Sequence, residues 1–226
     1  MGEDLGGVKL INLEIARLHH LTQDLKSCTH AELAENACKS GVRWVQLRTK
    51  NKPYEEWKKI ALEVKEVTDR FDAVMIINDN VDLAKEIGVH GVHLGKTDMN
   101  PGLARAVLGK DFIIGSTANN ANDVEELLQY DINYIGLGPF RYTATKNNLS
   151  PVLSALQLQY ILSSQNKIPV VVIGGIQLED VGQILKLGAH GVAVSSAINL
   201  ANDIEESASQ FMKEIVKLSE SGFSGL

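Results

Sequence analysis

The side chains best suited to chemistry stand in an alternating run, Val45-Gln46-Leu47-Arg48-Thr49-Lys50. Successive side chains of a β-strand point to opposite faces, so Gln46, Arg48 and Lys50 share one face. Two adjacent cations are costly to bury unless an anion compensates them, and a guanidinium with an ammonium suits a phosphate group. The run therefore predicts a diphosphate site, the alternative being that Arg48 and Lys50 are solvated residues beyond the strand end.

Two carboxylates follow later buried runs. Asp79 comes directly after Ile76-Ile77-Asn78, and Asp98 comes shortly after Val92-His93-Leu94. Magnesium is commonly held by one or two carboxylates together with substrate phosphates, and it neutralises charge on a leaving diphosphate. We therefore expect Asp79 and Asp98 to bind Mg²⁺. The alternative for Asp79 is a turn or helix N-cap residue.

Other polar residues at the ends of buried runs suit a heterocycle and a second anion. His93 alternates with apolar neighbours, so its ring points inward, where it can contact a bound heterocycle or be hydrogen-bonded as an ordinary core histidine. Hydroxyls, a lysine and backbone N–H groups at a helix start bind phosphate, although each turn alone also fits a tight turn with an N-cap. The candidates for the anion are Thr117, Thr143, Thr145, Lys146, Gly175, Ser195 and Ser196.

Eight short β-rich runs must position these residues. Helical stretches such as 54–67 and 121–130 separate most of them, and strands that alternate with helices imply parallel βαβ units. Eight units in 226 residues favour a single (β/α)8 TIM barrel of the α/β class over a doubly wound open sheet, which repeats the same unit. The predicted strands cover 16–21, 42–47, 73–77, 91–94, 112–114, 134–137, 170–173 and 191–194.

Composition limits the class of function and the location. A formal net charge of −6 gives no overall basic field, so we expect no nucleic-acid partner but allow a local anion pocket. No run reaches the ~20 apolar residues of a membrane span, and the N-terminal stretch lacks a signal-peptide pattern, so we expect a cytoplasmic protein without a membrane partner. No linker divides residues 1–226, so we expect one domain with loose ends at 1–10 and 219–226 around a core at 12–217.

The chain has two cysteines, Cys28 and Cys38. We expect both on one helix, as reduced structural thiols. Neither has a His or Cys partner at metal-ligand spacing.

Together, the motifs resemble the thiamine phosphate synthase family. The resemblance covers roughly residues 15 to 215 and rests on the run 46–50, Ile77-Asn78-Asp79, the run 91–95 followed by Asp98, Gly136-Leu137-Gly138-Pro139, the run 143–146, Ile173-Gly174-Gly175-Ile176 and Ser195-Ser196-Ala197-Ile198. It implies a transferase that joins aminomethylpyrimidine diphosphate to a thiazole phosphate and releases pyrophosphate. In the family the bond to pyrophosphate breaks first, so no protein nucleophile is required.

The resemblance also implies a role for each residue. The pyrimidine diphosphate would contact Gln46, Arg48, Lys50, Asn78, Thr117 and Lys146, of which the three cations would stabilise the leaving group. Magnesium would be held by Asp79 and Asp98. The thiazole phosphate would contact Thr143, Thr145, Gly175, Ser195 and Ser196. Self-association is common in barrels of this kind.

Several residues depart from the family pattern. Thr117 stands where Ser is usual, Asn119 where His is common, and Thr97 where an acid is common. Ser195 replaces an aliphatic residue, and Arg141-Tyr142 replace an aromatic-Pro pair. These changes put metal affinity and thiazole recognition in question.

Two other functions compete with the synthase. A thiazole tautomerase has the same barrel but needs a proton-transferring histidine, which would fall at Asn119. A catalytically idle barrel that binds thiamine precursors is the second alternative, because fold alone does not establish activity.

Overall fold

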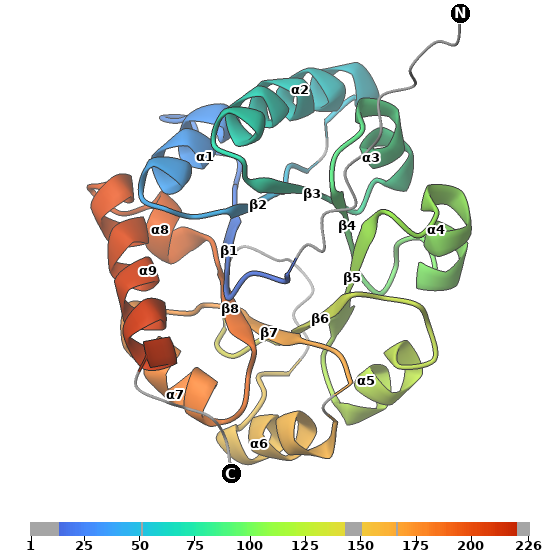
Figure 1. The fold of residues 1–226 in the computed structure, drawn as a ribbon, viewed down its shortest axis with the longest axis vertical. Helices are drawn as coiled ribbons and strands as arrows, with labels where there is room; N and C mark the ends of the chain where they lie inside the picture. Colours follow the sequence, from blue (N-terminus) through green and yellow to red (C-terminus); the bar gives the residue numbers. More distant parts are fainter. Residues whose placement is uncertain (1–13, 51, 143–150, 166, 221–226) are drawn as a thin grey trace, which may run out of the picture.

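The computed structural model describes residues 14–50, 52–142, 151–165 and 167–220, which form a closed parallel barrel surrounded by helices (Figure 1). β1 pairs with both β2 and β8, which closes the sheet. This closure confirms the predicted barrel and excludes the open sheet. The strands are β1 (Leu18–Leu21), β2 (Trp44–Leu47), β3 (Val74–Asn78), β4 (Gly91–Leu94), β5 (Ile113–Ala118), β6 (Tyr134–Leu137), β7 (Val170–Ile173) and β8 (Gly191–Val194).

Several helices of the described residues begin at a capping side chain. Asn80 accepts a hydrogen bond from the Leu83 amide at the start of α3, and Gly88 ends that helix in the left-handed conformation, at φ 64°. Helices of this part of the chain are α1 (His30–Lys39), α2 (Tyr54–Arg70), α3 (Val81–Ile87), α4 (Pro101–Leu108), α5 (Ala121–Leu127), α6 (Ala155–Ser164), α7 (Val181–Lys186), α8 (Ser196–Asn199) and α9 (Ile204–Glu220), with a 3-10 turn, η1, at Leu178–Asp180.

Several sequence predictions about element ends are wrong; the predicted strands 16–21 and 42–47, for example, begin only at Leu18 and Trp44. Cys28 lies before α1, because Thr29 and Glu32 form a capping box that starts the helix at His30. β5 continues through Ala118, because its last residues pair with β6. Ser219, expected in a loose tail, lies in α9 and donates a hydrogen bond of 2.8 Å to a backbone carbonyl one turn earlier. Residues 1–10 and 221–226 lie outside the described residues.

Both cysteines are free thiols, as predicted. Cys38 is buried on the inner side of α1. Burial raises the pKa of the Cys38 thiol to about 11, which keeps it protonated and unreactive.

Aromatic rings fill the interior of the barrel below its mouth. The His19 ring stacks on Trp44 with ring centroids 4.3 Å apart, and Tyr134 packs edge-on against both. Burial holds the pKa of His19 well below its usual range, so its ring is neutral and serves as packing surface. The interior is therefore closed, and polar chemistry is confined to the carboxyl ends of the strands.

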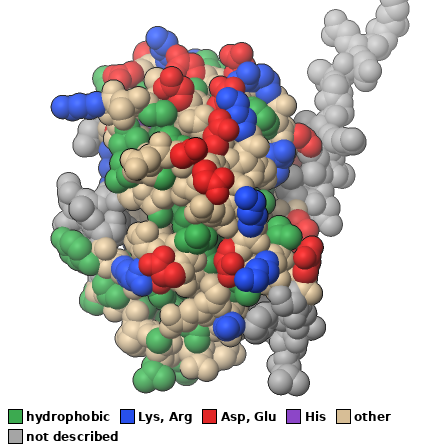
Figure 2. All heavy atoms as spheres, turned by 90° about the vertical axis from the view of Figure 1, so that its left-hand side faces the viewer, with side chains coloured by type: hydrophobic (Ala, Val, Ile, Leu, Met, Phe, Trp, Pro, Cys, Tyr) green, Lys and Arg blue, Asp and Glu red, His purple; other side chains and the backbone are tan. Residues whose placement is uncertain are grey.

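One face of the molecule, carrying α1 and α9, mixes positive and negative side chains (Figure 2). Lys39 of α1 lies 3.6 Å from Glu35 and 3.7 Å from Glu205 of α9. Such exposed pairs contribute about 0.2–1 kcal/mol each, so the Lys39–Glu205 pair ties the two helices together only weakly. Among the described residues, no helix is long and apolar enough to cross a membrane.

The space around Tyr134 depends on a glycine of the neighbouring strand. A Cβ at Gly115 would lie 2.1 Å from Cζ of the Tyr134 ring. We expect Gly115→Ala to lower the free energy of unfolding by about 2 kcal/mol in urea denaturation, because the buried ring cannot move aside without disturbing its neighbours. The matched control is Gly182→Ala in α7, where the nearest atom is 3.9 Å away and the change should stabilise by about 0.5 kcal/mol. Equal effects at the two sites would contradict this account.

Candidate active site

The polar floor of the barrel mouth is formed by side chains of β2 and β3. Nε2 of Gln46 donates a hydrogen bond of 2.9 Å to Oδ1 of Asn78, and both residues are buried. The alternation along β2 places Val45 and Leu47 in the core between barrel and helices, and Gln46 in the interior, as predicted. An amide pair fixed in this way presents its remaining polar groups toward the mouth.

His93 also lies in this floor. Its ring nitrogens lie 3.0 Å from the Tyr134 hydroxyl and 3.0 Å from Oγ1 of Thr117. Gly136 leaves room for the ring, since a Cβ there would lie 2.8 Å from Cε1 of His93. The geometry is that of a hydrogen-bonded core histidine, the alternative foreseen in the sequence, and contact with a heterocycle stays a prediction.

The two predicted carboxylates meet at the mouth. Asp79 has a left-handed backbone, at φ 68°, and its side chain is hydrogen-bonded to that of Asp98. Asn80, and not Asp79, caps α3, so the N-cap alternative for Asp79 is wrong. Asp98 is held in turn by the Gly95 amide, which donates to its Oδ2 at 2.6 Å.

The carboxylate pair carries an electrostatic imbalance. Burial, followed by the hydrogen bond and the charge of Asp98, raises the pKa of Asp79 to about 7, and the charges of Arg48 and Lys50 oppose this rise. Two carboxyl groups that share a hydrogen bond must hold a proton between them, and a divalent cation can replace this proton. Among the described residues, no group of three or more His, Cys, Asp or Glu could hold a metal alone. The pair thus fits a cation whose other ligands are phosphate and water.

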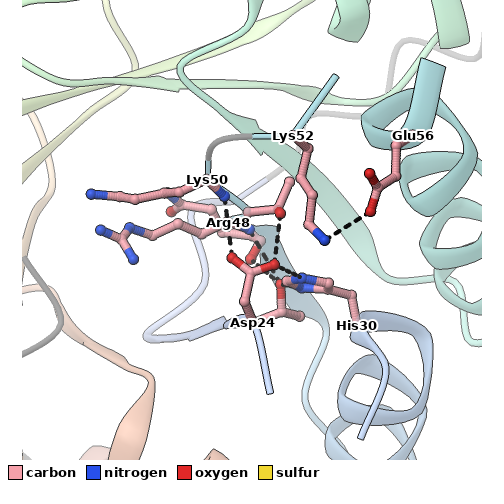
Figure 3. A network of polar contacts seen from close by, with 9 residues as sticks. Asp24, His30, Arg48, Lys50, Lys52 and Glu56 are labelled. Atoms are coloured by element: carbon pink, nitrogen blue, oxygen red, sulfur yellow. Dashed lines mark hydrogen bonds and ion pairs between the residues drawn. The ribbon is translucent and has the colours of Figure 1, made fainter. Parts of the chain in front are cut away.

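The two cations of the β2 end point in the same direction (Figure 3). Arg48 is half-buried and Lys50 is exposed. Burial lowers the pKa of the Arg48 guanidinium, while the charges of Asp79 and Asp24 raise it. Arg48 is therefore no solvated surface residue, whereas the position of Lys50 also fits that alternative.

A second polar group lies between the ends of β8 and β1. Ser195 and Ser196 donate hydrogen bonds of 3.0 and 3.3 Å to Oε1 of Gln23. Gln23 is buried and was missed in the sequence, where its place just after the run 18–21 was the available signal. Gly174 and Gly175 of the β7 end adopt left-handed conformations, at φ 107° and 64°. Thr143, Thr145 and Lys146 lie outside the described residues.

Arg141, which departs from the family pattern, ties the β6 end to the β7 end. Its guanidinium makes two hydrogen bonds of 2.7 and 2.6 Å to the buried carboxylate of Asp180. Its amide donates to the Gly174 carbonyl at 2.9 Å. A bidentate pair with this geometry fixes the backbone beside Gly175.

The sequence profile described as thiamine monophosphate synthase matches residues 20–198. The chain belongs to this family. A thiamine-phosphate synthase of Bacteroides fragilis is 44% identical over 194 residues, which cover 84% of this chain and 95% of the relative. One from Flavobacterium psychrophilum is 44% identical over 183 residues, covering 79% and 89%. The solved structure of a thiamine phosphate pyrophosphorylase from Pyrococcus furiosus matches with a TM-score of 0.80 and 29% identity, over 89% of this chain and 96% of that one.

Membership in the thiamine monophosphate synthase family confirms the resemblance inferred from the motifs. It also favours the synthase over the tautomerase, since the curated relatives carry the name of the synthase. The roles of individual residues remain predictions.

The raised pKa of Asp79 predicts a dependence of stability on pH in metal-free protein. Because the folded-state pKa lies above the ordinary value of 3.8, the stabilisation by this group is complete below that value and is lost as pH rises through about 7. We expect Asp79→Asn, measured with chelator by thermal denaturation, to stabilise the protein above that pH by more than ~1 kcal/mol and to have a smaller effect in acid. A constant difference at all pH values would disprove the assignment.

The Arg141–Asp180 pair predicts a second effect on stability. We expect Arg141→Ala to lower the free energy of unfolding by about 1–2 kcal/mol, because it leaves a buried carboxylate without its cation. This figure allows for solvent screening, since the Arg141 side chain is 46% exposed. The double variant Arg141→Ala/Asp180→Asn should recover part of the loss in urea denaturation. Additive losses would show that the two residues are not coupled.

Proposed function

We propose that this chain is a Mg²⁺-dependent thiamine phosphate synthase that joins aminomethylpyrimidine diphosphate to a thiazole phosphate and releases pyrophosphate. The observation that carries the proposal is the hydrogen-bonded Asp79–Asp98 pair beside half-buried Arg48 at one barrel mouth. Carboxylates for a metal and a cation for phosphate oxygens are the two elements that stabilisation of a leaving diphosphate needs.

Different residues are proposed to contact the heterocycle and the diphosphate of the pyrimidine substrate. Gln46 and Asn78 offer a rigid amide pair to the heterocycle, with His93 and Thr117 alongside. Arg48 and Lys50 balance the negative charge of the diphosphate as it leaves, and Lys146 is proposed to join them. Magnesium, held by Asp79 and Asp98, would neutralise the remaining charge on the diphosphate.

Thiazole phosphate is proposed to bind at the other side of the mouth. The hydroxyls of Ser195 and Ser196 donate hydrogen bonds to the Gln23 side chain. Gly175 has a left-handed backbone and lies close to Arg141. Hydroxyls and backbone N–H groups after β7 and β8 commonly form a phosphate site in such barrels. Thr143 and Thr145 are proposed to complete it.

The side chain of Asn119 disfavours the tautomerase alternative. Its amide donates a hydrogen bond of 2.5 Å to the Gly138 carbonyl, at the end of β6. An amide does not exchange protons near neutral pH as an imidazole does, so this position cannot relay the proton that isomerisation requires. Self-association and a cytoplasmic location remain predictions.

The decisive experiment supplies both substrates with Mg²⁺ and measures thiamine phosphate and pyrophosphate with and without chelator. We expect equal amounts of the two products, and no turnover when the metal is removed. Binding of both substrates without any product would favour the idle barrel. Turnover that survives chelation would refute the metal assignment.

Arg48→Ala tests the assignment of the diphosphate pocket. We expect KM for the pyrimidine diphosphate to rise by about tenfold or more, the loss expected for one charge-assisted hydrogen bond, with little change in KM for the thiazole phosphate. The control is Arg43→Ala, which removes an exposed arginine just before β2, at the opposite end of the barrel. Equal rises for the two substrates would count against the assigned pockets.

A further inference from the structure

Three consecutive residues after β2 are each tied to the segment that follows β1. The Arg48 amide donates to Oγ1 of Thr22 at 3.2 Å. The Thr49 hydroxyl donates to Oδ1 of Asp24 at 2.9 Å, and the Lys50 amide donates to Oδ2 of the same carboxylate at 3.2 Å. Two acceptors therefore hold the whole segment from Arg48 to Lys50, as Figure 3 shows around Asp24.

His30 links these two acceptors to each other. Its Nδ1 lies 2.7 Å from Oγ1 of Thr22, and its Nε2 lies 3.3 Å from Oδ1 of Asp24. Because Thr22 accepts from the Arg48 amide, its own proton can point to Nδ1, and Nε2–H then donates to the carboxylate. Burial lowers the pKa of His30, which favours the neutral ring that this arrangement requires.

Helix formation does not account for the bonds of this ring. His30 is the first residue of α1, but the start of the helix is already satisfied by Thr29 and Glu32, whose side chains each bond to the backbone of the other. The His30 side chain is buried and turns away from those groups, toward Thr22 and Asp24. Its bonds thus serve the segment after β2.

That segment needs an anchor of this kind. β2 ends at Leu47, so the residues that carry the two cations lie beyond the strand. Thr49 is buried and turns toward Asp24, while the neighbouring side chains of Arg48 and Lys50 point together in another direction (Figure 3). Like charges presented together repel each other, and a free loop would relieve the repulsion by separating them.

We propose that Asp24 and His30 are positioning residues of the diphosphate site, which hold the backbone of Arg48–Lys50 so that both cations meet one diphosphate. The inference rests on the proposed function. Neither residue is assigned a contact with substrate; both act through the backbone amides and the Thr49 hydroxyl. Pre-organised cations bind an anion more tightly because less side-chain and loop entropy is lost on binding.

If Asp24 were only a counter-charge to the cations, its removal would have the opposite effect on anion binding. Removing a negative charge beside two cations strengthens their field, so an anion would bind more tightly. The Asp24 side chain is 44% exposed, and solvent therefore screens its charge, whereas its hydrogen bonds are local. The two roles can be separated by the sign of the effect of Asp24→Asn.

The test measures the dissociation constant of inorganic pyrophosphate with Mg²⁺ by calorimetry, and KM for each substrate. We expect Asp24→Asn to weaken pyrophosphate binding and to raise KM for the pyrimidine diphosphate by about tenfold, while KM for the thiazole phosphate stays within about twofold. The matched control is Glu56→Gln, which removes a nearby carboxylate that is paired with Lys52 at 2.8 Å. It should leave every value unchanged.

Thr49 supplies an independent variant and a rescue. Thr49→Val removes the donor to Asp24 at constant shape and should weaken pyrophosphate binding several-fold, whereas Thr49→Ser keeps the hydroxyl and should restore it. If Asp24→Asn does not fold, as judged by thermal denaturation, the Thr49 pair decides the matter.

The outcomes separate the inference from the proposed function. If the wild type neither turns over nor binds pyrophosphate, the proposed function fails and the inference falls with it. If the wild type does both and Asp24→Asn matches it or binds pyrophosphate more tightly, only the positioning role is overturned.

Discussion

The crowding of charge at one rim of the barrel is the constraint on which the rest of this structure depends. All eight strands are parallel, so the cations after β2 and the carboxylates after β3 and β4 emerge at the same edge. Burial and the neighbouring Asp98 raise the pKa of Asp79, and the charge of Asp79 partly offsets the effect of burial on the pKa of Arg48. Each group is costly alone, and together they form a mouth whose charge, under the proposed function, would be balanced by a metal and a diphosphate.

The lower half of the barrel makes this arrangement possible. Tyr134, Trp44 and His19 fill the interior, and Gly115 and Gly136 leave room for the rings of Tyr134 and His93. These described rings pack against one another beneath the floor. Under the proposed function, substrates meet the chain at the mouth, where loops from different strands contribute unlike groups.

The sequence predicted the features that depend on local patterns. Alternation in the run 44–47 identified which side chains face inward, and the number of buried runs identified the barrel. Cys28 was misplaced although Thr29 and Glu32 stand at the spacing of a capping box, a signal in the sequence that places the helix start after Cys28. The end of β5 was missed because strand length is decided by pairing with β6.

Contacts between distant parts of the chain were out of reach of sequence reasoning. Asp180 is 39 residues from Arg141, and Gln23 is 172 residues from Ser195, yet both pairs shape the mouth. Asp24 and His30 stood out by no motif, since their importance comes from the backbone groups of the β2 end. Periodicity indicates the face on which a side chain lies, but not which partner it meets there.

The central claim is that the Asp79–Asp98 pair gives up its shared proton when magnesium and diphosphate bind. Proton release can be measured by titrating Mg²⁺ into the protein with pyrophosphate, about one pH unit below the pKa of Asp79, in two buffers of different ionisation enthalpy. The account predicts that the wild type releases about one proton more per site than Asp79→Asn, a difference that removes the protons that pyrophosphate itself loses to Mg²⁺. Tight binding of Mg²⁺ and pyrophosphate with equal proton release in both proteins would contradict it.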